Sequence, residues 1–102
     1  MLLRIKFDNI FTMEDEKVEK IIEEYDKYAR QNGFSLNSNK KVVEGIVKGL
    51  LKNEEKYGAR YCPCRRVSGY LEKDKAKICP CSWHRKEIVK YGHCLCCLFV
   101  KN

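Results

Sequence analysis

The sequence lacks any hydrophobic run that approaches the roughly 20 apolar residues that a helix needs to cross a bilayer. Charged residues make up 34% of its 102 residues and the mean hydropathy is −0.53, so we expect no membrane-embedded segment. The first seven residues have charges among the apolar ones and no small-residue cleavage site, so we also expect no secretory signal. With 44% hydrophobic residues the chain is too apolar to stay disordered, and its length fits one compact domain.

Cysteine is absent from the first 61 residues, whereas the last 41 contain all seven, at positions 62, 64, 79, 81, 94, 96 and 97. Without a secretory signal we expect a cytoplasmic, reducing location, where structural disulfides are uncommon. An odd number of cysteines also argues against a fully paired disulfide framework. Metal binding, thiol redox chemistry or both remain, and a chain this small needs such help to supplement its core.

Low-complexity stretches and internal repeats are also absent, so we interpret residues 1–102 as a single domain in three parts. Residues 1–11, where Leu3, Ile5 and Phe7 alternate with polar residues, predict an extended arm. Residues 12–58 predict two helices. We expect the first to stop at Gly33, and the second to be capped by Ser38 and to end before Gly58. Apolar residues recur at helical spacing in each helix, at Val18, Ile21, Ile22, Tyr25 and Tyr28 and at Val42, Val43, Ile46, Val47, Leu50 and Leu51.

Glycine and proline are scarce, and their positions are therefore informative. Gly45 and Gly49 lie inside the second predicted helix, where they either allow another backbone to approach closely or are tolerated without a role. Both prolines stand between cysteines, and a Cys-Pro-Cys segment cannot lie inside a helix because proline lacks the amide donor. Residues 59–102 are therefore expected to be rich in loops, with a short helix from Trp83 to Tyr91 stopped by Gly92 and an apolar tail that packs inward.

Three Cys-x-Cys pairs, at 62/64, 79/81 and 94/96, form the most informative pattern in the chain. Zinc sites usually have two to four residues between paired cysteines, and thioredoxin-type redox motifs have two, so the spacing argues against both. A 4Fe–4S cluster takes four thiolates, which leaves two of the six paired cysteines. Such a cluster transfers one electron at a time whereas disulfide cleavage needs two, so two further cysteines beside a cluster have a use as a redox disulfide. A zinc-stabilised interaction module and a simple 4Fe–4S electron carrier are the alternatives.

The order Cys-Pro-Cys, Cys-Pro-Cys, Cys-x-Cys resembles the catalytic subunit of ferredoxin:thioredoxin reductases. Segments 24–29, 43–50, 57–59 and 97–99 are also similar to that family, so the resemblance covers about residues 14–100. It implies a mainly α fold in which helices pack on a loop-rich, cysteine-rich half that wraps a 4Fe–4S cluster. It also implies an oxidoreductase that passes electrons from ferredoxin to a redox disulfide, and on to a thioredoxin or glutaredoxin-like protein.

The same resemblance implies a role for each paired cysteine. Cys64 and Cys96 would form the redox disulfide, with Cys64 as the exposed nucleophile and Cys96 held against the cluster. Cys97 stands where the family usually has methionine, and no role is assigned to it. Four cysteines would ligate the cluster: Cys62, Cys79, Cys81 and Cys94.

The chain departs from the plant-type pattern in its spacers, which have fourteen and twelve residues, and in Leu95, which stands where the family has histidine. That histidine is thought to assist proton transfer at the disulfide, and His93 or His84 is expected to replace it. These departures suggest a bacterial or archaeal type of ferredoxin:disulfide reductase. The plant enzyme also has a second, variable subunit, and the sequence leaves its presence here open.

Acidic residues are fewer than basic ones, 14 against 21, which gives a net charge of +7. Basic charge suits the docking of an acidic ferredoxin through long-range attraction. A solvated surface is the plain alternative for the basic residues beside the cysteines, which include Arg65, Arg66, Arg85 and Lys86. Nucleic-acid binding is not expected, because no nucleic-acid motif is present and acidic residues are mixed through the chain.

Overall fold

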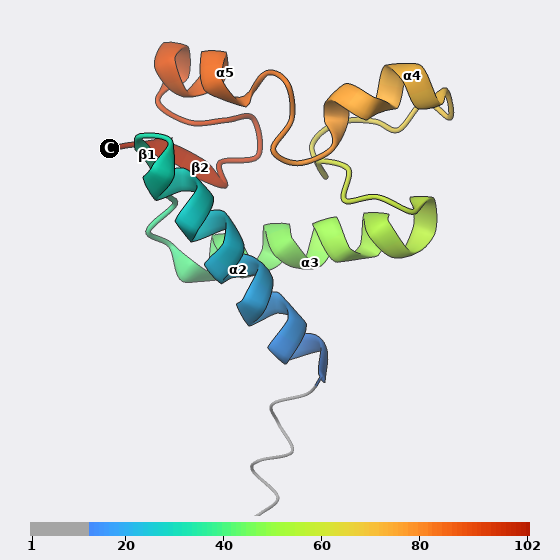
Figure 1. Ribbon diagram of the computed structural model, residues 1–102, viewed down its shortest axis with the longest axis horizontal. Coiled ribbons are helices and arrows are strands. Elements are labelled where there is room, and N and C mark those ends of the chain that lie inside the picture. Colours follow the sequence, from blue (N-terminus) through green and yellow to red (C-terminus); the bar gives the residue numbers. More distant parts are fainter. Residues whose placement is uncertain (1–12) are drawn as a thin grey trace, which may run out of the picture.

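The computed structural model describes residues 13–102, so the arm predicted for residues 1–11 lies outside the described residues. The predicted mainly α architecture is confirmed. Within residues 13–102, no helix has both the length and the apolar character to cross a membrane. Along the chain the elements are α2 (Met13–Gln31), β1 (Phe34–Leu36), α3 (Lys40–Tyr57), α4 (Leu71–Asp74), the 3-10 helix η1 (Lys75–Lys77), α5 (His84–Tyr91) and β2 (Phe99–Lys101) (Figure 1).

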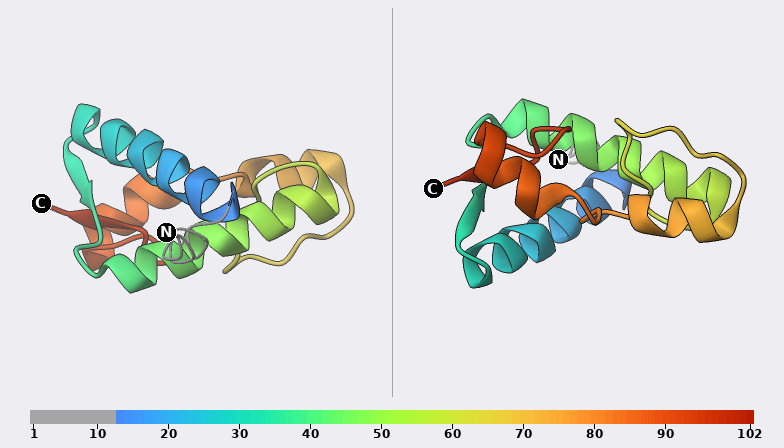
Figure 2. Two further views of the ribbon diagram at one scale, coloured as in Figure 1. Left: turned by 90° about the horizontal axis from the view of Figure 1, so that it is seen from below. Right: turned by 90° about the horizontal axis from the view of Figure 1, so that it is seen from above.

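The two long helices, α2 and α3, cross each other, and the cysteine-rich half lies along one side of them (Figures 1 and 2). Helix α5 lies near the end where β1 and β2 pair, whereas α4 lies over the C-terminal end of α3. Cys62, Cys94 and Cys96 belong to the same buried cluster as the apolar faces of α2 and α3. The cysteine motifs are therefore part of the hydrophobic core.

Both long helices bury one face because their apolar residues recur at helical spacing, as predicted. The N-terminal cap of α3 is Asn39, whose side-chain oxygen accepts from the amides of Lys41 and Val42. The predicted cap Ser38 is wrong by one residue, because the helix begins at Lys40. Val42 was expected on the buried face but is exposed, and Gly58 ends α3 in the left-handed conformation as predicted. The buried residues of the two helices are Val18, Ile21, Tyr25 and Ala29 in α2 and Val43, Val47 and Leu50 in α3.

The C-terminal tail packs inward, as predicted, by pairing with the segment between the long helices. Strand β2 runs antiparallel to β1, with Leu36 opposite Phe99 and Phe34 opposite Lys101. Leu98 and Phe99 are fully buried, and the Phe99 ring meets that of Phe34 edge-on at 5.3 Å between centroids. The sheet itself was not predicted, because strands of three residues show too little alternation to be recognised in a sequence.

The loop between the first two cysteine motifs is organised by the buried carboxylate of Asp74. It accepts hydrogen bonds from the amide and hydroxyl of Ser68, both at 2.8 Å, and from the Gly69 amide at 2.9 Å. The Lys77 ammonium donates to the same carboxylate at 2.9 Å. These donors, the Ser68 amide foremost, hold the pKa of Asp74 well below its usual range. One side chain therefore fixes the whole polar loop.

The two glycines inside α3 have different surroundings. A Cβ added at Gly49 would lie 3.0 Å from Cγ of Pro63, whereas one added at Gly45 would meet no atom within 4 Å. Of these two glycines, only Gly49 is closely approached by another part of the chain. Its neighbour is the proline side chain of the first cysteine motif rather than another backbone.

Replacing Gly45 by alanine is expected to raise the free energy of unfolding by about 0.5–1 kcal/mol, because alanine favours a helix and meets no neighbour there. Gly49→Ala gains the same propensity but must displace Pro63, so we expect it to be less stable than Gly45→Ala by about 1 kcal/mol or more. Urea unfolding of both variants beside the unmodified protein measures the difference. Equal stabilisation by the two would show that Pro63 does not need the glycine.

Because the pKa of Asp74 is lower in the folded state than in the unfolded state, its stabilising contribution is fully present above about pH 4 and is lost as the pH falls further. Asp74→Asn removes the charge at nearly constant size. We expect the variant to melt at a lower temperature than the unmodified protein at neutral pH and to approach it in acid. Melting temperatures measured across this range test the prediction, and a pH-independent difference would contradict it.

Candidate functional site

The first two cysteine motifs lie side by side although they are distant in the sequence. The Cys62 amide donates to the Lys77 carbonyl at 2.8 Å, and the Cys79 amide donates to the Arg60 carbonyl at 2.9 Å. Together with an isolated antiparallel bridge between the same segments, these bonds form a short ladder just before each Cys-Pro-Cys. The ladder therefore fixes the spacing of the two motifs.

The third motif is held by the C-terminal tail, which turns back on itself. The Cys94 amide donates to the Phe99 carbonyl at 3.0 Å, and the Phe99 amide donates to the Cys94 sulfur at 3.4 Å. Cys97 occupies the turn with a φ of +66°, which is uncommon for a residue with a side chain. The Asn37 side-chain amide donates to its carbonyl at 2.9 Å. The segment that completes the core thus also positions Cys94.

Five of the cysteine thiols line one largely apolar cavity. Its walls include all four predicted cluster ligands, Cys62, Cys79, Cys81 and Cys94, together with Cys96. In the part of the chain that the structure describes, no three His, Cys, Asp or Glu side chains converge closely enough to hold a single metal ion. The four predicted ligands around this cavity match the number of thiolates that a 4Fe–4S cluster takes. Apolar side chains complete the walls, among them Ile46, Pro63, Leu95, Leu98 and Phe99.

Burial controls the acidity of these thiols. It raises the pKa of Cys79 to about 12 and also raises that of Cys94, because a thiolate is poorly solvated in the cavity. Coordination to a metal reverses this preference, since a coordinating thiol is deprotonated outright. The chemistry of the donor set therefore fits a cationic iron–sulfur group held by thiolates.

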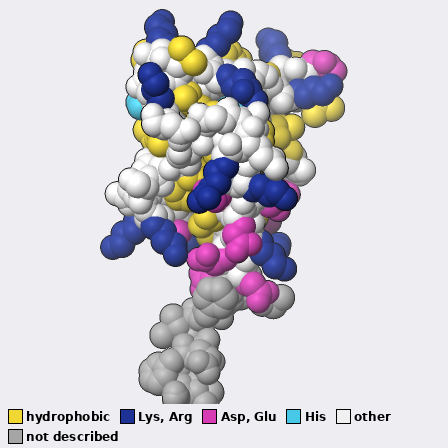
Figure 3. Space-filling view, turned by 60° about the vertical axis from the view of Figure 1, so that its left-hand side comes forward, with side chains coloured by type: hydrophobic (Ala, Val, Ile, Leu, Met, Phe, Trp, Pro, Cys, Tyr) yellow, Lys and Arg dark blue, Asp and Glu magenta, His cyan; other side chains and the backbone are white. Residues whose placement is uncertain are grey.

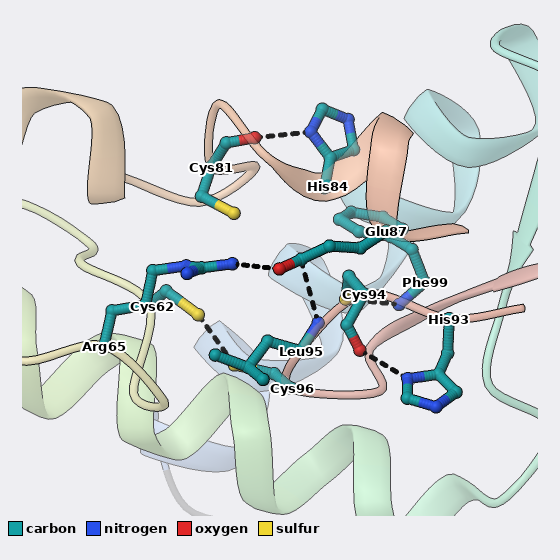
Figure 4. A network of polar contacts seen from close by, with 10 residues as sticks. All are labelled: Cys62, Arg65, Cys81, His84, Glu87, His93, Cys94, Leu95, Cys96 and Phe99. Atoms are coloured by element: carbon teal, nitrogen blue, oxygen red, sulfur yellow. Dashed lines mark hydrogen bonds and ion pairs between the residues drawn. The ribbon is translucent and has the colours of Figure 1, made fainter. Parts of the chain in front are cut away.

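Cys96 lies beside one predicted ligand and the predicted nucleophile. Its sulfur is 2.7 Å from that of Cys62 (Figure 4), and an interaction with the Cys64 thiol contributes to the raised pKa of Cys96. The hydrogen bond from Cys96 lowers the pKa of Cys62, and the same bond raises that of Cys96. Cys96 is buried whereas Cys64 is exposed. One thiol of the predicted redox pair is thus accessible to a partner and the other faces the cavity, while their disulfide stays a prediction.

His84 belongs to the scaffold of the second motif. Its Nδ1–H donates to the Cys81 carbonyl at 2.5 Å, so Nε2 accepts from the Tyr28 hydroxyl at 2.8 Å. Burial lowers its pKa, which favours the neutral imidazole that these two bonds require. Both ring nitrogens are occupied, so His84 links α2 to the second motif. His84 was one of two candidates to replace the histidine that the family has at the position of Leu95, but both of its ring nitrogens already make hydrogen bonds.

His93, the predicted catalytic histidine, is exposed beside the third motif. Its Nδ1 lies 2.7 Å from the Cys94 carbonyl oxygen and 3.5 Å from the Cys97 sulfur. In Figure 4 its ring points away from the paired sulfurs of Cys62 and Cys96. The structure thus places His93 beside Cys97, and its role in proton transfer stays a prediction.

Sequence analysis missed an ion pair at the site. Arg65 was interpreted as a basic residue beside the first cysteine motif, but its Nη2 donates to Glu87 at 2.6 Å and its guanidinium lies 4.4 Å from the Trp83 ring centroid. The other carboxylate oxygen of Glu87 accepts from the Leu95 amide at 3.0 Å. A signal was present in the sequence, because Glu87 is the single acidic residue after Asp74.

Comparison with known proteins places these features in a family. The family model described as "Ferredoxin thioredoxin reductase catalytic beta chain" matches residues 12–102. The chain is 33% identical to the "Ferredoxin-thioredoxin reductase, catalytic chain" of Porphyra purpurea over 81 residues. This matched segment covers 74% of this chain and 64% of that protein. The chain is 32% identical over 99 residues to the "Ferredoxin-thioredoxin reductase catalytic chain, chloroplastic" of Arabidopsis thaliana, covering 89% and 63%. The chain thus spans less than two thirds of the length of these relatives.

Replacing Tyr28 by phenylalanine removes the hydroxyl that donates to the buried His84. We expect the free energy of unfolding to fall by about 1–3 kcal/mol, because a buried acceptor is left without a partner. Tyr91→Phe is the matched control, since Tyr91 is exposed, and should change stability by less than about 0.5 kcal/mol. Urea unfolding compares them, and equal effects would mean that His84 does not depend on this bond.

Proposed function

This chain belongs to the ferredoxin thioredoxin reductase catalytic beta chain family, and from that membership we propose that it reduces protein disulfides with electrons from a ferredoxin. The single observation that carries the proposal is the placement of the six paired cysteines. Five of them line one cavity, and the sixth, Cys64, is exposed next to the cavity residue Pro63. Such a reductase needs a protected redox centre beside a thiol that a large partner can reach.

Four residues are proposed to hold a 4Fe–4S cluster in the cavity: Cys62, Cys79, Cys81 and Cys94. When bound, the cluster supplies single electrons to the neighbouring redox pair. The chain supports one of the ionised ligands with a donor, because the Phe99 amide donates to the Cys94 sulfur. Leu98 and Phe99 help to exclude water from the same space.

The thiol chemistry is assigned to Cys64 and Cys96. Two electrons and two protons convert their disulfide to two thiols. The Cys64 thiolate then attacks one sulfur of the target disulfide, and the second target sulfur leaves as a thiolate that takes up a proton. The Cys96 thiolate finally attacks Sγ of Cys64, which closes the Cys64–Cys96 disulfide and releases the first target sulfur. Exposure suits Cys64 to the attack, and burial suits Cys96 to the closing step.

Charge supports an acidic electron donor. In Figure 3, Lys and Arg side chains are spread over the face with hydrophobic side chains between them, whereas most Asp and Glu side chains on it gather in its lower part. The net charge of +7 would attract an acidic ferredoxin at long range. The acceptor is proposed to be a thioredoxin or glutaredoxin-like protein.

The metal content separates this proposal from a zinc-stabilised module. Protein purified without oxygen is expected to be brown and to contain about four irons and four sulfides per chain. Two thiols should become countable in the denatured protein only after reduction. A colourless protein with one zinc would refute the reductase and favour an interaction module.

Cys64→Ser tests the proposed nucleophile. The variant is expected to keep its iron and sulfide but to lose disulfide-reducing turnover, because serine does not form the mixed disulfide. Cys97→Ser is the matched control and should retain both properties, since Cys97 is outside the proposed ligand and redox sets. Turnover with a ferredoxin and a thioredoxin measures the outcome. A Cys64→Ser protein with undiminished turnover would contradict the proposal.

A further inference from the structure

A single carboxylate joins the loops that contain the two proposed redox cysteines. One oxygen of Glu87 accepts from Arg65 at 2.6 Å, and the other accepts from the Leu95 amide at 3.0 Å (Figure 4). Arg65 directly follows Cys64, and Leu95 directly precedes Cys96. The Glu87 bridge, meaning Arg65, the Glu87 carboxylate and the Leu95 amide, therefore ends one residue from each member of the pair.

The bridge is anchored on a well-packed helix. Glu87 lies in α5, where its neighbour Ile88 is buried and His84, one turn earlier, is held by the bonds to Cys81 and Tyr28. The motif loops are short and irregular by comparison. The carboxylate is thus the rigid member of the bridge, and the two loops are fixed relative to it.

The ion pair of the bridge is also largely shielded from water, whereas the Leu95 bond is exposed. The side chains of Arg65 and Glu87 are each 17% exposed, whereas those of Arg30 and Asp26, an ion pair on α2, are 76% and 40% exposed. Charge-assisted bonds in such partly buried positions are stronger and more directional than exposed pairs. The Trp83 ring covers the Arg65 guanidinium and restricts its orientation further. Arg65 is therefore well placed to hold its loop in one position.

We propose that Glu87 is a positioning residue for the redox pair, and that its bridge holds the Cys64 loop and the Cys96 loop in register through the reaction. This inference rests on the proposed function. When Cys64 is bound to a target sulfur, Cys96 must still reach Sγ of Cys64. The bridge prevents the Cys64 loop from moving away with the target, so the Cys64–Cys96 bond forms and the target sulfur leaves as a thiolate.

The equilibrium between the Cys64–Cys96 pair and glutathione measures how well the bridge holds the two loops in register. Oxidised glutathione and the dithiol protein exchange to give the Cys64–Cys96 disulfide and two molecules of reduced glutathione. A pair held in register favours the closed disulfide, whereas a loose pair accumulates the mixed disulfide of Cys64 with glutathione. Acid quenching, thiol alkylation and peptide mass spectrometry quantify both species in the cluster-loaded protein.

Glu87→Gln is the main variant, because it is nearly isosteric and can keep the Leu95 bond but not the ion pair. We expect the equilibrium constant for closing the disulfide to fall about tenfold, which raises the reduction potential by about 30 mV. The mixed disulfide should increase in parallel. Asp26→Asn, which removes one carboxylate from the exposed pair, should change neither quantity.

Arg65→Gln breaks the same ion pair from the other side and serves if Glu87→Gln folds poorly. Iron content and melting temperature identify variants that retain the fold. If the bridge acts as a unit, the two variants have equal effects and their combination has no larger effect than either one. Additive effects would overturn the bridge as a unit.

Two further outcomes separate this inference from the proposed function. A folded Glu87→Gln protein with an unchanged glutathione equilibrium would overturn the positioning role and leave the reductase proposal standing. Absence of a Cys64–Cys96 disulfide in the oxidised unmodified protein would overturn both. A shift that the Asp26→Asn control shares would also overturn the inference, because it would be an effect of charge alone.

Discussion

The placement of five thiols around one apolar cavity, four of them buried and Cys79 half-buried, is the constraint on which the rest of this structure depends. A thiolate there is poorly solvated, as the raised pKa values of Cys79 and Cys94 show, so the charged form needs a cation beside it. The same cavity is continuous with the core, because Cys62, Cys94 and Cys96 pack with the apolar faces of the long helices. Binding of the proposed cluster and folding of the cysteine-rich half are therefore expected to be coupled.

Hydrogen bonds of polar side chains determine the shape of the cysteine-rich half. Asp74 gathers amide, hydroxyl and ammonium donors around the loop between the first two motifs. His84 ties the second motif to α2, and Glu87 ties the first motif to the third. Each of these side chains is wholly or largely buried, so leaving a partner unpaired is costly. A loop-rich segment with few apolar residues is thus made rigid by three small networks.

The spacing of apolar residues and glycines in the sequence was enough to predict the helices and where they end. Apolar residues at helical spacing located α2 and α3, and Gly58 and Gly92 marked the ends of α3 and α5. The cysteine order predicted the family of the chain, because that order is specific to it. The cap of α3 was misplaced by one residue, since both Ser38 and Asn39 are good caps and only the backbone at Asn39 turns into the helix.

Contacts between distant segments could not be predicted in the same way. The pairing of β1 with β2 and the bond from Glu87 to Arg65 join residues without any periodic pattern. The contact between the sulfurs of Cys62 and Cys96 likewise arises from the way two distant loops fold together. One further consequence follows from Trp83. It is the only tryptophan in the chain, it is partly exposed, and it stacks on Arg65 next to the first motif. Its fluorescence therefore arises beside the first cysteine motif alone, and the chain contains its own optical reporter of events at the proposed redox centre.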